Sequence, residues 1–60
     1  MNKFYVGDVV GYERETKEWK IIKAELTVDS HGTEDVEYTI KKFEGKDIGR
    51  TEKVLAGVLS

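Results

Sequence analysis

Residues 22–28, with the sequence IKAELTV, decide the fold because apolar and polar side chains alternate strictly along them. The apolar set is Ile22, Ala24, Leu26 and Val28. A period of two places these four side chains on one face of a β-strand and the polar side chains on the other. We therefore expect a half-buried strand over 22–28, with the apolar set facing the core.

The residues just before this stretch leave an alternative open. Trp19 and Ile21 are out of phase with the apolar set, so a longer strand would need a β-bulge near Ile21 and Ile22. A helix over 15–26 competes, because the segment is rich in helix formers and Trp19, Ile22 and Leu26 fit a helical stripe. The unbroken alternation is the rarer chance event, and it favours the strand.

The N-terminal part also indicates a strand, over residues 4–13, where β-branched and aromatic residues predominate. Gly7 and Asp8 interrupt it early and suit a turn. Gly11 indicates a bulge or the close approach of another backbone. The charged segment 13–18 is expected to be an exposed connection.

The C-terminal half reads as strands joined by turns. A turn is expected over 29–33, a third strand over 36–41 in a hairpin with 22–28, a second turn over 44–47 and a short fourth strand over 48–51. A helical turn over 52–55 and a short last strand would follow. The apolar tail 54–59 exceeds what a small barrel covers easily, so a homodimer is among the expected states.

Length and composition limit the function. The chain has 60 residues with 10 basic and 12 acidic side chains, one histidine, no cysteine and no proline. A chain of this size forms one domain, 1–60, with a single core that buries about 60% of the unfolded surface. No apolar run spans a bilayer and no signal region is present, so we expect a cytoplasmic protein that is not membrane-bound. Without a supported catalytic constellation, we expect no enzyme activity and no cofactor.

The turn 29–33 contains the one group of side chains that suggests a metal. Asp29, His31 and Glu34 lie close in sequence. A metal site needs more than one histidine and a defined geometry, so we interpret these residues as a solvated turn and expect no metal. No nucleophile is spaced to form a catalytic triad with His31.

Together these segments resemble the strands of SH3-like small β-barrels, including Tudor and KOW domains. The resemblance implies an all-β fold: a small five-stranded antiparallel SH3-like barrel with one short helical turn before the last strand. The matching segments are Val6–Val10 for the first strand, Tyr12 with the charged loop and 19–26 for the second, 36–40 with 43–46 for the third strand and its glycine turn, and 52–55 for the helical turn.

The resemblance also implies a way of binding. Some Tudor domains hold methylated side chains in an aromatic cage, and Tyr12, Trp19 and Phe43 occupy roughly the matching strand ends, whereas Tyr38 alternates with core residues. We therefore expect a non-catalytic protein-interaction module, an accessory protein of the bacterial or phage type, that docks on a protein partner through an aromatic-lined barrel face. Trp19 also suits the core, as the largest apolar side chain.

The alternative function is a nucleic-acid-associated barrel. Residues 1–40 carry a balance of −4, with five basic and nine acidic side chains, whereas residues 41–60 carry +2, with five basic and three acidic side chains. The interspersed carboxylates and the replacement of the basic KOW loop by 13–18 argue against it. The candidate contacts are the basic residues of the last segment, namely Lys41, Lys42, Lys46, Arg50 and Lys53.

Overall fold

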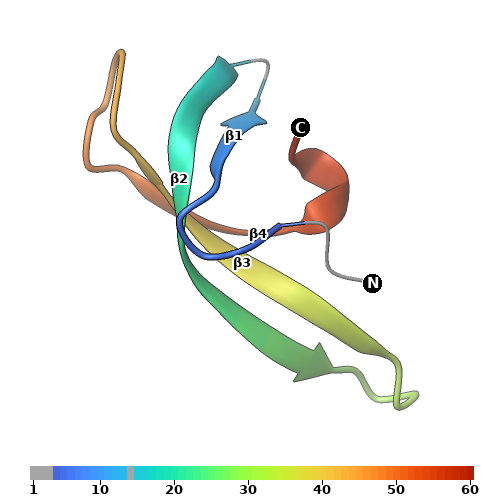
Figure 1. Cartoon of the computed structure of the whole chain (residues 1–60). Helices are drawn as coiled ribbons and strands as arrows, with labels where there is room; N and C mark the ends of the chain where they lie inside the picture. The colour runs from blue at the N-terminus through green and yellow to red at the C-terminus, as the bar shows by residue number, and fades with distance from the viewer. Residues whose placement is uncertain (1–3, 14) are drawn as a thin grey trace.

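A four-stranded antiparallel sheet curls into a half-barrel in the computed structural model, which describes residues 4–13 and 15–60 (Figure 1). The strands pair in chain order. They are β1 (Val9–Tyr12), β2 (Glu15–Val28), β3 (Glu34–Lys42) and β4 (Thr51–Leu55), and a 3-10 turn, η1 (Ala56–Val58), follows β4. The prediction of an all-β fold is confirmed.

The strand reading of β2 is confirmed, and the competing helix over 15–26 is wrong. The register of β2 against β3 shifts between Ile21 and Lys23, which is the expected bulge. β2 also begins earlier than expected, at Glu15, so most of the predicted connection 13–18 is strand. The turn into β2 begins at Glu13, which has a positive φ of 53°.

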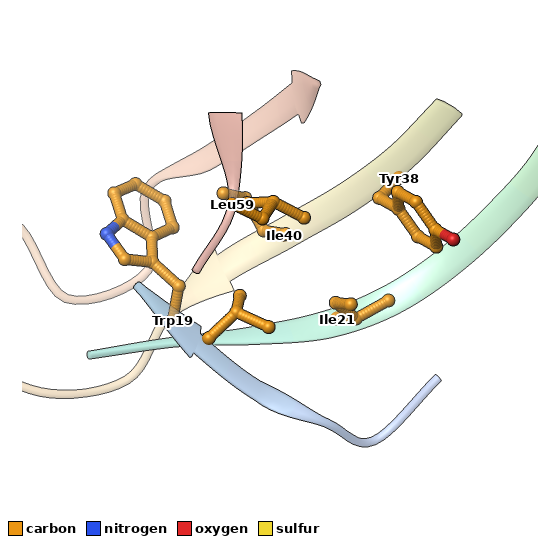
Figure 2. Packing of buried hydrophobic residues seen from close by; sticks show 6 residues of the cluster. Trp19, Ile21, Tyr38, Ile40 and Leu59 are labelled. Carbon is orange, nitrogen blue, oxygen red and sulfur yellow. The ribbon is translucent and has the colours of Figure 1, made fainter. Parts of the chain in front are cut away.

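The bulge determines which side chains of β2 reach the core. Directly opposed residues of an antiparallel pair share a face. Trp19 lies opposite Lys42, Ile21 opposite Ile40 and Ala24 opposite Tyr38. We call this the inner face. The buried apolar cluster lies between this face and the C-terminal segment, which contributes Leu59 (Figure 2). Its strand members are Val10, Trp19, Ile21, Tyr38 and Ile40.

The expected burial of the alternating set is wrong. Ile22 is 45% exposed, Leu26 64% and Val28 61%. Leu26 and Val28 do share the inner face, since they lie opposite Val36 and Glu34, but the β2–β3 hairpin extends past the ends of β1 and β4. The covered part of the face is therefore the part that carries Trp19 and Ile21. These two residues are out of phase with the alternating set and were not part of it.

The first described residues and the C-terminal residue are both held against the sheet. Residues 5–8 form the expected turn: the Asp8 amide donates to the Tyr5 carbonyl at 3.0 Å and the Asp8 carboxylate accepts from the Tyr5 amide at 2.9 Å. Gly11 has both expected features. The register of β1 shifts beside it, and its backbone exchanges two hydrogen bonds with Ser60, at 2.8 and 3.1 Å.

The C-terminal prediction needs three corrections. The sheet has four strands, not five, in the described part of the chain. Residues 48–50, expected to be strand, belong to a turn, and β4 occupies 51–55, whereas a helical turn was expected over 52–55. The 3-10 turn comes after β4, and no last strand follows it in the described residues. The physical reason is alternation along β4, because Glu52 and Val54 lie opposite the buried Ile40 and Tyr38 while Lys53 faces outward.

The apolar tail is partly covered. Leu59 is buried at 8% exposure, and Val54 and Ala56 pack against the core. Leu55 and Val58 remain exposed at 48% and 55%. Among the described residues no helix is long and apolar enough to cross a membrane.

Replacing Trp19 by alanine should unfold the domain. Trp19 is 0% exposed, and a buried Trp→Ala change costs about 3–5 kcal/mol, which is as much as a core of this size supplies in total. Circular dichroism with urea titration measures the loss. The matched control is Ile48→Ala, at a side chain 67% exposed, which should shift stability by no more than about 0.5 kcal/mol. A folded Trp19→Ala variant of near wild-type stability would contradict this core.

Candidate functional site

The expected aromatic site is largely internal. Of the two roles weighed for Trp19, the structure places it in the core, with 0% exposed. Tyr12 packs edge-on against Trp19, with ring centroids 5.3 Å apart and planes at 88°, and it is half-buried. Phe43 is 43% exposed, just beyond the end of β3. These three residues do not enclose an open cage.

Cations of the chain itself already lie over the indole ring. Lys42 Nζ is 5.6 Å from the centroid of the Trp19 ring, and Arg50 Cζ is 5.7 Å from it. These are the contacts that a cage would offer to a ligand cation. The Trp19 Nε1 atom is buried and has no hydrogen-bond partner. The aromatic cluster therefore serves internal packing.

A hollow of about 450 Å³ opens beside this cluster. Lys42, at 4% exposure, forms an ion pair with Glu18 Oε2 at 3.1 Å in its wall. The 43–50 loop closes over the pair, since the Phe43 amide donates to the Glu18 carbonyl at 3.0 Å. The remaining lining residues come from that loop, and they are Gly45, Lys46 and Asp47. The charged groups in the wall of this hollow, Lys42 and Glu18, neutralise each other, so we interpret the hollow as a structural feature and not as a binding site.

The five predicted nucleic-acid contacts do not share one face. Lys42 is buried on the inner face, and Lys46 lines the hollow. Arg50 pairs with Glu52 at 3.0 Å and with Glu13 at 3.6 Å. The hydrogen bond that Arg50 Nε donates to the Glu52 carboxylate raises the pKa of the Arg50 guanidinium.

Lys41 and Lys53, in contrast, point to the outer face of the sheet, as the register of β3 and β4 shows. Lys20 and Lys23 of β2 join them there. Sequence reasoning missed these two lysines. The available signal was the bulge: once it is placed at Ile21–Ile22, Lys20 and Lys23 fall on the same outer face.

Exposed apolar side chains lie on the end of the β2–β3 hairpin. We call residues 22–37 the arm. Leu26 and Val28 are exposed there, and Val36 is half-buried between them and the core. β1 pairs with β2 only up to Lys20, and Gly7 and Asp8 bond to Ile21. Among the described residues, no strand pairs with β2 from 22 to 28 on the side away from β3.

The turn at the tip of the arm uses its polar groups for its own geometry. Asp29 Oδ1 accepts from the His31 amide at 2.8 Å and from the Thr33 amide at 2.9 Å. This is the pattern of a capped turn. Over residues 4–13 and 15–60, no group of three or more acidic, histidine or cysteine side chains could hold a metal ion.

Gly45→Ala should destabilise the domain more than Gly32→Ala. Both glycines have a positive φ, 79° and 80°, so both variants carry the same backbone strain of about 1 kcal/mol. A Cβ at position 45 would lie 2.6 Å from Glu18 Oε2, whereas one at position 32 meets nothing within 4 Å. Displacing Glu18 weakens its pair with buried Lys42, so we expect a further loss of about 1–3 kcal/mol. Urea denaturation of both variants checks this, and equal losses would contradict it.

Comparisons with protein family models, with curated proteins and with solved structures return no match. The structure of the described residues shows a small curled half-barrel sheet of four antiparallel strands, and no match assigns it to the SH3-like family.

Proposed function

We propose that this chain is a small, non-catalytic protein-binding module that accepts an extended segment of a partner protein along the arm. The observation that carries the proposal is the edge of β2 between Ile22 and Val28, which no strand of residues 4–13 or 15–60 pairs with on the side away from β3. An unpaired strand edge presents a row of backbone donors and acceptors, and adding a strand to such an edge is a common mode of peptide recognition.

Apolar side chains along the same edge would supply affinity. Leu26 and Val28 are each more than three-fifths exposed. Burying a leucine or valine side chain fully is worth about 1.5–3 kcal/mol. Both lie on the inner face. The side chains of an added strand that point to this face would therefore pack beside them. This replaces the expected aromatic docking face, since Trp19 is buried.

The charge of the arm defines the partner's chemistry. Residues 22–37 carry one basic side chain, Lys23, and five acidic ones, a balance of −4. Opposite charges across an interface steer encounter and select partners. The proposed ligand is therefore an extended segment in which apolar residues alternate with lysine or arginine.

Synthetic ten-residue peptides test the proposal. One pool alternates valine or leucine with lysine or arginine, and a second places glutamate at the basic positions. Fluorescence anisotropy should show binding of the basic pool and none of the acidic pool. A proline in the middle of a bound peptide should abolish binding, because it removes a backbone donor and cannot continue the ladder.

The double variant Leu26→Ser/Val28→Ser should weaken peptide binding at least about tenfold, which corresponds to 1.4 kcal/mol. The control variant Ile48→Ser/Val58→Ser removes two apolar side chains of similar exposure, 67% and 55%, away from the arm, and should bind as wild type. Equal losses in both variants would contradict docking at the arm. So would a dimer in sedimentation equilibrium that the arm variant alone disrupts, because a second copy would then occupy the edge.

A further inference from the structure

Four lysines gather on the outer face where β2, β3 and β4 run side by side. Lys20 lies directly opposite Lys41 in the β2–β3 register. One step further along, Lys23 lies opposite Thr39, and Thr39 lies opposite Lys53 of β4. We call Lys20, Lys23, Lys41 and Lys53 the lysine patch.

The patch is exposed, and Glu25 at its edge partly neutralises Lys23 and Lys53. All four lysines are exposed to solvent. In the part of the chain that the structure describes, Lys23 pairs with Glu25 at 2.8 Å, and no carboxylate forms an ion pair with Lys20, Lys41 or Lys53. Like charges directly opposite each other in a sheet destabilise it. The fold thus keeps an unfavourable Lys20–Lys41 pair that contributes nothing to the core.

The spacing of the patch suits a chain of phosphates. Neighbouring strands lie about 4.8 Å apart, and alternate residues of one strand about 6.6 Å apart. The lysines therefore present several ammonium groups over a surface roughly 10 Å across. Duplex DNA carries one negative charge per about 1.7 Å of its axis, so one such surface meets several phosphates at once.

We propose that the lysine patch binds the phosphate backbone of duplex nucleic acid without reading its sequence. The two threonines within the patch, Thr39 and Thr51, can donate hydroxyl hydrogen bonds to phosphate oxygens. The described outer-face positions of β2, β3 and β4 carry no aromatic side chain on which bases could stack. The patch therefore contacts the phosphate backbone and not the bases.

The neighbouring carboxylates set the orientation. The next row along the outer face pairs Glu25 with Glu37, and the row beyond it places Asp35 beside Thr27. These charges repel phosphates, so the acidic end of the sheet points away from the nucleic acid. The tip of the arm would then face solvent. This inference does not rest on the proposed protein-binding function, because the two surfaces lie on different faces of the sheet.

Fluorescence anisotropy with a labelled 30-base-pair DNA duplex tests the proposal. Between 50 and 200 mM NaCl, the logarithm of the binding constant should fall against the logarithm of the salt concentration with a slope of about −3, as for three to four phosphate contacts. The variant Lys20→Gln/Lys41→Gln should lower the magnitude of this slope by about 2 and weaken binding at 50 mM salt by at least about tenfold.

A matched control separates the patch from net charge. Lys17→Gln/Lys46→Gln also removes two positive charges, but from exposed positions outside the patch, and it should keep the wild-type slope. Circular dichroism confirms that both variants fold. Equal losses in the two variants, or no binding at 50 mM salt, would overturn the proposal. Displacement of the duplex by polyglutamate at an equal concentration of charge would also overturn it, since an acidic protein surface would then be the better ligand.

Discussion

The burial of Trp19 is the constraint on which the rest of the structure depends. In a chain of 60 residues without cysteine, this one indole supplies a large share of the apolar surface that can be covered. Placing it on the inner face requires the bulge between Ile21 and Lys23, because the alternation downstream has the opposite phase. Lys42 and Arg50 then lie over the ring, and the 43–50 loop folds back to seat Lys42 beside Glu18. The core, the loop and the ion pair follow from one side chain.

The same constraint leaves two surfaces without an internal role. The core fills the part of the half-barrel beside Trp19. The β2–β3 hairpin extends past the ends of β1 and β4, and this extension is the arm (Figure 1). A two-stranded ribbon alone is only marginally stable in water, and its apolar inner face gains from any strand that covers it. On the outer face, the bulge brings Lys20 and Lys23 into line with Lys41 and Lys53. We propose that the open edge of the arm, beside Leu26 and Val28, binds protein and that the lysine patch binds phosphates.

The first three strands, the hairpin turn and both bulges could be predicted from the sequence, because alternation and glycine placement are local signals. Burial could not. Leu26 and Val28 sit on the predicted face and remain exposed, since cover depends on where β1 and β4 end, which no pattern within β2 encodes. The C-terminal error has a similar cause: 51–55 is short enough to suit either a helical turn or a strand, and pairing with β3 decides it. The basic residues of the last segment are close in sequence, but the adjacent Lys41 and Lys42 point to opposite faces of one strand. The lysine patch could therefore be found only from the pairing register of β2, β3 and β4.

Native-state hydrogen exchange, followed residue by residue by NMR, tests the central claim that the core ends beside Trp19 and leaves the arm open. Amides of Ile21 and Ile40 should exchange only through global unfolding, because they lie within the covered sheet. Amides of β2 between 23 and 28 that point to the free edge should exchange at least about a hundredfold faster, at every protein concentration. Protection of the arm equal to that of Ile21 in the isolated protein would contradict the account, since it would mean that the edge is already covered.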